Sequence, residues 1–222
     1  MKPPQFYRRF DYDRRLLPNP RLRELEEGVT DIETARLRSG LTIGYPGWGL
    51  IYQMMLNQLH WDQPNIVIET GTNWGCSTIV LAQAVKDSRG GGHVHSIEID
   101  GGNLEKAREN IAAAGLDDVV TLHHGDALRV LPDVLSAVQE VRAAFLDGGH
   151  AHDQAVGEFE LILPKLSQAG IVLFDNTYGI CEGEADERVF GALKTIKARH
   201  GGNIVNFERT SWYTPGLAVW QR

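Results

Sequence analysis

Acidic and amide side chains follow five short apolar stretches of this chain, each at the point where the stretch ends. They are Glu69, Glu98 with Asp100, Asp126, Asp147, and Asp175 with Asn176. Carboxylate and amide oxygens accept hydrogen bonds from the hydroxyl and amino groups of a polar ligand. A single such residue means little, but five in succession indicate a ligand site.

A glycine turn accompanies the first of these acids. The segment Glu69-x-Gly71-x-x-x-Gly75 joins an apolar stretch to a predicted helix that begins at Cys76. Glycines allow close approach of the backbone to a ligand, and a helix start offers free N–H groups and a positive dipole end. The spacing differs from the Gly-x-Gly-x-x-Gly of dinucleotide-binding proteins, which favours another nucleoside ligand.

The elements that position these residues alternate along the chain. We predict strands at 66–68, 93–97, 119–122, 143–146, 170–174, 203–207 and 217–220, with helices at 76–86, 104–114 and 128–138 and around Phe159–Leu166 and Val189–Ile196. Pro132 interrupts the third of these helices, and Gly115 ends the second. The fold class is α/β, with a doubly wound, mostly parallel seven-stranded sheet and a terminal antiparallel hairpin. Ligands bind beyond the carboxyl ends of the strands in such sheets.

The N-terminal part of the chain lacks this alternation of strands and helices. We expect residues 1–43 to be a helical extension, with helices at 21–27 and 31–38, and residues 44–222 to form the main domain. Asp31 is a predicted helix cap, Gly44–Gly49 a loop, and Leu50–Leu59 an amphipathic helix. The extension packs on the domain or on a second subunit. Tyr45, Trp48 and Tyr52 offer aromatic contacts at the junction, and a homo-oligomer, with a dimer favoured, is expected.

Composition narrows the function classes. The formal net charge of −7 argues against nucleic acid as a partner. The longest uncharged run, 41–61, contains too many glycines and polar side chains to cross a membrane. Cys76 and Cys181 give neither a disulfide framework nor metal spacing. We therefore expect a cytoplasmic protein that acts on a small molecule.

From Gly44 to Arg222 the chain resembles class I S-adenosylmethionine-dependent methyltransferases, and among them the metal-dependent O-methyltransferases of the catechol and macrolide-sugar types. The resemblance implies a Rossmann-like methyltransferase fold. It also implies that the first motif holds the methionine end of S-adenosyl-L-methionine, through Glu69, Gly71, Asn73, Gly75 and Ser77. In the segment SIEID, Glu98 matches the acid that binds the ribose hydroxyls, and Ile99 matches the apolar neighbour of the adenine. Asp126 and Ala127 fall at the adenine edge.

Elementary chemistry agrees with the ribose assignment and leaves the adenine one open. A carboxylate just past a strand is a good acceptor for two vicinal hydroxyls, so Glu98 fits ribose binding better than helix capping. Asp126 could equally cap the helix that follows it, and Asp100 is expected to be such a cap.

The resemblance also implies a metal site. Asp147 in FLDGGH, with Asp175 and Asn176 in FDN, falls at the positions of the divalent-metal ligands in the catechol-type enzymes. Two carboxylates and an amide oxygen are hard ligands suited to Mg²⁺ or another divalent cation. Aspartates at these strand ends also occur in methyltransferases that bind no metal, and the adjacent asparagine favours the metal.

His150 departs from the catechol pattern, in which a lysine base stands three residues after the first aspartate. The sugar-type enzymes resemble this chain more closely there, with a histidine as general base. A neutral imidazole can accept a hydroxyl proton near neutral pH. His152 is the alternative base. Glu182, Glu184 and Asp186 are candidates for a further acid on the substrate side.

These residues predict O-methyl transfer to a hydroxyl group of a small molecule of the sugar or natural-product type, assisted by a divalent cation. Two rivals stay open at this point. One is a nicotinamide-dependent oxidoreductase on a similar sheet, and the other is a non-catalytic module that only binds S-adenosylmethionine.

Overall fold

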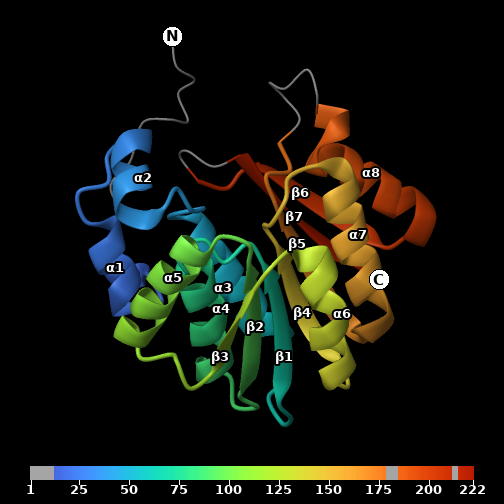
Figure 1. The fold of residues 1–222 in the computed structure, drawn as a ribbon, viewed down its shortest axis with the longest axis horizontal. Helices are drawn as coiled ribbons and strands as arrows, with labels where there is room; N and C mark the ends of the chain where they lie inside the picture. Colours follow the sequence, from blue (N-terminus) through green and yellow to red (C-terminus); the bar gives the residue numbers. More distant parts are fainter. Residues whose placement is uncertain (1–12, 179–184, 212–214) are drawn as a thin grey trace.

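Seven strands form one sheet in the order β3-β2-β1-β4-β5-β7-β6. The structure is a computed structural model, and it describes residues 13–178, 185–211 and 215–222. The strands β1 to β5 run parallel, and β7 pairs antiparallel with both β5 and β6 (Figure 1). Their bounds are β1 Asn65–Thr70, β2 Gly92–Glu98, β3 Val120–His124, β4 Val141–Leu146, β5 Leu166–Asp175, β6 Asn203–Arg209 and β7 Pro215–Gln221. The predicted doubly wound sheet with a terminal hairpin is confirmed.

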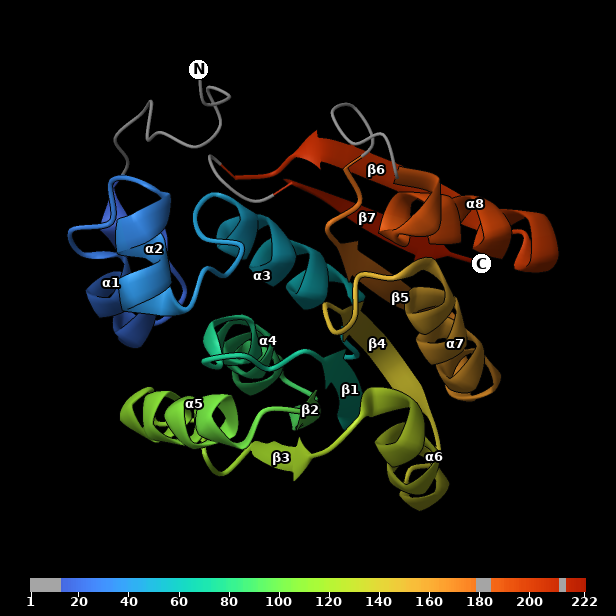
Figure 2. The same cartoon turned by 45° about the horizontal axis from the view of Figure 1, so that its top comes forward.

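Helices cover both faces of the sheet (Figure 2). One face carries α3 Gly47–Gln58, α4 Cys76–Asp87 and α5 Gly101–Ala113. The other carries α6 Ala127–Ala137, α7 His152–Ile162 and α8 Val189–His200. Short 3₁₀ turns lie at η2 Arg14–Leu16, η3 Leu163–Lys165 and η4 Ala185–Glu187. Each face has its own apolar core, so the sheet is buried between two helical layers.

Two further helices, α1 Pro20–Glu26 and α2 Ile32–Ser39, lie outside α4 and α5 (Figure 2). Leu17, Leu22 and Leu25 are buried in the same core cluster as α3 and α4. The side chain of Asn19 donates to Gln83 Oε1, at 2.8 Å, and to the Ala114 carbonyl. Of the two packings that the sequence left open for this segment, the structure therefore shows the one against the domain.

Several local predictions are confirmed. Asp31 caps α2, accepting from the Glu33 and Thr34 N–H groups, and Asp100 caps α5 by accepting from the Asn103 N–H. Gly115 follows α5 with a φ of 68°, a left-handed conformation that glycine adopts without strain.

Three predictions are wrong. The chain at Gly47–Gly49 is the first turn of α3 and not part of a loop, because Trp48 and Ile51 pack into the core there. Trp48 is fully buried, so it offers nothing to a second subunit. Pro132 lies inside α6 without ending it.

In the described part of the chain, no helix is long and apolar enough to cross a membrane.

Candidate active site

A cavity of about 530 Å³ opens at the carboxyl ends of the parallel strands. This volume suits a nucleoside-sized ligand. The sequence-predicted site residues that line it are Gly71, Asn73, Ser77, Glu98, Ile99, Asp126, Ala127, Asp147, His150, Asp175 and Asn176. Two predicted residues, Glu69 and Gly75, are not among its lining residues.

The glycine turn between β1 and α4 has little room for side chains. Gly71 has a φ of 83°, and a Cβ at this position would overlap the backbone carbonyl of Asp147. Gly75 has a φ of 80° and contacts Ala107 of α5 instead of the cavity. Asn73 points its backbone N–H at Glu98 Oε2, at 2.6 Å, and its side-chain amide at the Gly40 carbonyl, at 2.7 Å. The turn therefore joins β4, α5, β2 and the end of α2.

Glu69 lies beneath the turn with its side chain fully buried. Its Oε2 accepts hydrogen bonds from the hydroxyls of Thr78, at 2.5 Å, and Ser96, at 2.6 Å. Burial raises its pKa to about 7, although the hydroxyl donors of Ser77, Ser96 and Thr78 act in the opposite direction. In this arrangement Glu69 braces the start of α4 from below.

At the other end of the cavity, Glu98 is nearly buried and accepts two backbone N–H groups, from Asn73 and from Asp100, at 2.9 Å. Each of its oxygens keeps a lone pair for a ligand hydroxyl. Ile99 is 67% exposed at the rim. Asp126 caps α6 by accepting from the Leu128 N–H at 2.9 Å, and it also lines the cavity. Capping and ligand contact are thus compatible for Asp126.

The partly buried carboxyl group of Asp147 and the buried carboxyl group of Asp175 meet at the ends of β4 and β5. Burial raises the pKa of Asp147 to about 8, and the charges of Glu69 and Glu158 act in the same direction. The pKa of Asp175 is raised well above its usual range, by burial first and then by the charge of Asp147. Asp175 Oδ2 accepts from the Asn176 amide at 2.9 Å, whereas Oδ1 is buried and has no partner among the described residues. An unpaired buried oxygen beside a second carboxyl group is costly unless a ligand or cation binds there.

Asn176 and His150 complete this corner of the cavity. Asn176 has a φ of 55°, a left-handed conformation that is uncommon outside glycine and that turns its side chain toward His150. His150 Nε2 lies 3.0 Å from Asn176 Nδ2 and 3.3 Å from Asp147 Oδ1. His152, the alternative base, instead points away, toward Asp153 and Thr195 of α8, and does not line the cavity.

The cavity also has lining residues that the sequence did not indicate. Leu41 and Thr42 form a wall that follows α2. Gln154 and Glu158, one turn apart on α7, line the other side. Glu158 is 1% exposed, and it accepts from Thr70 Oγ1 and Gln154 Nε2, both at 2.6 Å. Their four-residue spacing was a signal for one helix face, but the predicted helix was placed around Phe159–Leu166 and α7 begins earlier, at His152.

Of the three candidates for a further acid, the structure describes only Asp186, which does not line the cavity. Asp186 is exposed and pairs with Lys194 at 2.6 Å. Glu182 and Glu184 lie outside the described residues, as does Cys181. Cys76 is buried, and burial raises its pKa to about 12, so its thiol is not a nucleophile.

Residues 68–177 match a protein family described as a methyltransferase domain. This stretch of the chain is therefore similar to methyltransferase domains. The matched stretch begins within β1 and ends just beyond β5, so it includes the glycine turn, Glu98 and the Asp147–Asp175 pair. The whole seven-stranded sheet, with its antiparallel β7, has the Rossmann-like methyltransferase fold.

Known proteins agree with this assignment. An Arabidopsis thaliana protein, provisionally assigned as a caffeoyl-CoA O-methyltransferase, is 31% identical over 110 residues, which cover 50% of this chain and 45% of the relative. The chain thus matches less than half of that relative's length. The O-methyltransferase TomG from Streptomyces achromogenes, solved in complex with SAM, superposes with a TM-score of 0.72 at 19% identity, covering 92% of this chain and 91% of its own. A Bacillus cereus O-methyltransferase in complex with SAH gives 0.72 at 19% identity, covering 91% and 90%.

Proposed function

We propose that this protein is an S-adenosylmethionine-dependent O-methyltransferase that acts on a hydroxyl group of a small molecule with the help of a divalent cation. The observation that carries the proposal is the unpartnered, buried Oδ1 of Asp175 beside Asp147, in the same cavity as Glu98 and Ile99. One end of this cavity suits a nucleoside, and the other suits a cation and a hydroxyl group.

The donor end is built from the chain's own groups. Glu98 holds the ribose hydroxyls, Ile99 covers one face of the adenine, and Asp126 and Ala127 meet its edge. Asn73 and Ser77 lie beside the methionine end, where the glycine turn brings the backbone close. When bound, S-adenosylmethionine supplies an electrophilic methyl group on a positively charged sulfur. The cavity has an acidic surrounding that favours a cationic ligand, made by Glu69 just beneath it and by Glu98, Asp126, Asp147, Glu158 and Asp175 along it.

The cation end fits the residues that are present. Asp147, Asp175 and Asn176 offer oxygen donors. Burial is the main cause of the raised pKa values of both aspartates, and a bound cation would favour their charged forms. Within the described ranges, no group of three or more His, Cys, Asp and Glu side chains has a metal-binding arrangement, so the site would depend on the amide oxygen of Asn176. A divalent cation held there would supply Lewis-acid assistance, lowering the pKa of the acceptor hydroxyl.

His150 is the proposed general base. Its imidazole is partly exposed to the cavity, and its Nε2 lies beside Asp147 and Asn176. In the neutral form Nε2 can take the hydroxyl proton as the oxygen attacks the methyl group, and it then returns that proton to solvent. The Asn176 amide faces Nε2 in this structure, so the acceptor hydroxyl would take the place of that amide before the proton is transferred.

The proposal is tested first by binding. Isothermal titration should show that S-adenosylhomocysteine binds and that NAD⁺ does not. Glu98→Ala should weaken binding by about 10-fold or more, because two charge-assisted hydrogen bonds are lost. Asp117→Ala, a change at an exposed aspartate remote from the cavity, is the control. Equal affinity in Glu98→Ala would contradict the cofactor assignment.

The second test concerns the cation. Mg²⁺ or Mn²⁺ should bind wild-type protein and not Asp175→Ala, with binding of S-adenosylhomocysteine retained in both. Turnover with an identified acceptor should be lost in EDTA and restored by the metal. Full turnover in EDTA would eliminate the metal and leave the cofactor assignment standing.

A further inference from the structure

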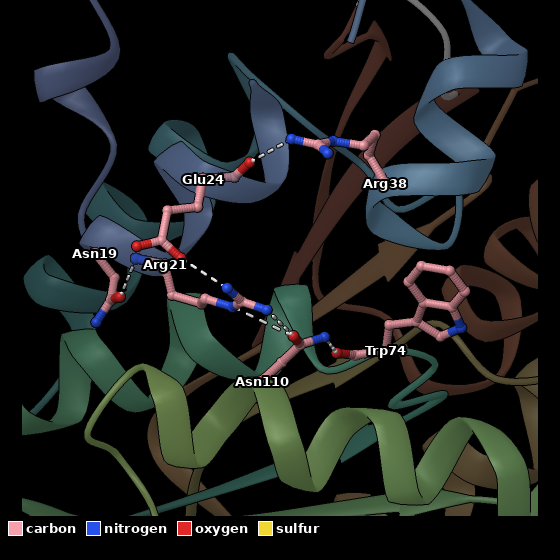
Figure 3. Close-up of polar contacts among 6 residues, drawn as sticks. All are labelled: Asn19, Arg21, Glu24, Arg38, Trp74 and Asn110. Carbon is pink, nitrogen blue, oxygen red and sulfur yellow. Dashed lines mark hydrogen bonds and ion pairs between the residues drawn. The ribbon is translucent and has the colours of Figure 1, made fainter. Parts of the chain in front are cut away.

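A buried asparagine connects the N-terminal helices to the glycine turn. Asn110 of α5 is completely buried. Its Oδ1 accepts two N–H groups of Arg21, from Nη2 at 2.8 Å and from Nε at 3.3 Å. Its Nδ2 donates to the backbone carbonyl of Trp74 at 2.8 Å. One side chain thus bridges α1 to the turn (Figure 3).

The bridge is specific in its chemistry. Among the residues drawn in Figure 3, only Asn110 contacts both α1 and the turn, and its amide accepts from a guanidinium with one end while it donates to a carbonyl with the other. Arg21 is itself held in place by Glu24, at 2.6 Å. Trp74 lies between Asn73 and Gly75, so its carbonyl reports the conformation of the turn that approaches the ligand.

A second set of contacts joins the turn to the end of α2. The Asn73 amide donates to the Gly40 carbonyl, and the Cys76 thiol lies 3.6 Å from the Ser39 carbonyl. Gly40 packs so closely on the Trp74 ring that an added Cβ would come within 2.8 Å of it. Leu41, which follows, has a φ of 61° and lines the cavity with Thr42. The turn is therefore held on one side by α5 and α1 and on the other by the chain that forms the cavity wall.

We propose that Asn110 is a positioning residue of the cofactor site, through which α1 holds the glycine turn in its ligand-binding shape. The inference rests on the proposed function, since it takes the ligand of the turn to be S-adenosylmethionine or its product. Coupling between two sites is reciprocal: if α1 favours the binding shape of the turn, then ligand binding must stabilise α1. A bound ligand can slow amide exchange in residues 41–42 by direct contact. Its effect on α1 must instead pass through Asn110 and Arg21.

Two measurements test this coupling on the full-length protein. Titration with S-adenosylhomocysteine should give an affinity about 10-fold lower for Asn110→Ala than for wild type, within the range usual for coupled sites. Hydrogen–deuterium exchange should show that the ligand slows exchange in residues 20–26 of wild type. In Asn110→Ala that slowing should be lost in 20–26 and retained in 39–42.

Further variants separate positioning from general loosening. Asn110→Asp keeps the acceptor for Arg21 but loses the donor to the Trp74 carbonyl, so α1 should stay docked while affinity for the ligand falls. Arg21→Gln should weaken binding less than Asn110→Ala does. Arg38→Gln is the matched control, since Arg38 contacts the Glu24 carbonyl at 3.4 Å and does not touch the turn (Figure 3). It should leave the affinity unchanged.

The outcomes are distinguishable. If wild-type protein fails to bind S-adenosylhomocysteine, both the proposed function and this inference are overturned. If wild type binds, and folded Asn110→Ala and Asn110→Asp bind equally well, this inference alone is overturned. Equal losses in Arg38→Gln and Asn110→Ala would also overturn it, because they would show that any loosening of the N-terminal helices acts in the same way.

Discussion

Replacing Asp147 by asparagine should stabilise the protein in the absence of metal while removing its function. Asp147 is partly buried beside Asp175, and desolvation raises its pKa from 3.8 to about 8 on folding. The folded state therefore binds more protons than the unfolded state between about pH 4 and pH 8, and the free energy of unfolding falls as the pH rises through this window. Asparagine has a similar shape but does not titrate, so Asp147→Asn removes this loss.

The size of the effect follows from the shift. Each pKa unit corresponds to about 1.4 kcal/mol, so the linkage approaches ~5 kcal/mol at pH 8 and is less than ~2 kcal/mol at pH 5. Relaxation of the site and its coupling to Asp175 reduce what is measured, and we expect a gain of about 1–3 kcal/mol at pH 8.

The assay is urea unfolding in EDTA at pH 5 and pH 8, with Asp117→Asn, a change at an exposed aspartate, as control. The gain in Asp147→Asn should be larger at pH 8. Mg²⁺ should then stabilise wild type and not the variant, because a cation that binds only the folded state shifts the equilibrium toward it. A variant less stable than wild type at pH 8, or one with the pH dependence of Asp117→Asn, would refute the reasoning.

Three further changes probe other parts of the cavity. Gly71→Ala should cost about 2 kcal/mol or more in urea unfolding and abolish binding of S-adenosylhomocysteine, because its Cβ would overlap the Asp147 backbone; a normal unfolding midpoint would contradict this. Ile99→Ser should weaken binding by roughly 5-fold with no shift in Tm, since the side chain is exposed until a ligand covers it; titration and thermal unfolding decide. His150→Ala should lower kcat by about 10²–10⁴-fold while binding of cofactor and metal survives, and near-normal turnover would eliminate it as the base.

The parallel sheet and most of the cavity could be predicted because both follow from local pattern. Apolar strands alternating with amphipathic helices leave few topologies, and the carboxyl ends of parallel strands converge at one edge. Glu98, Asp126, Asp147 and Asp175 therefore come together although they are far apart in sequence. The order of the strands in the sheet came from the structure and not from the sequence.

The sequence was less informative where a side chain's direction or a distant packing contact decides. Side chains alternate between the two faces of a strand, so Glu69 lies on the same face of β1 as Val67, the face that α4 covers. Glu69 is therefore buried under the turn and does not line the cavity. Leu41 and Thr42 reach the cavity only because Leu17, Leu22 and Leu25 bind the N-terminal helices to α4 and α5. No local pattern carries that information.

The division of the chain at residue 43 stays a prediction, and the packing bears on how it should be tested. Ile43 belongs to the same core cluster as Leu22, Trp48 and Ile51. Fragments that begin at residue 44 would leave this cluster open to solvent and would remove Leu41 and Thr42 from the cavity wall.

The position of β7 in the sheet implies that residues 68–177, which match the methyltransferase family, are not a folding unit by themselves. β7 lies between β5 and β6, and Asp175 of β5 pairs with Leu217 of β7. Residues 68–177 alone would leave β5 with an unpaired edge and would strip Trp220 from the core that covers Phe159. The segment that matches the family and the segment that folds therefore have different boundaries. The matched segment needs strands from beyond Asn176 to complete the sheet.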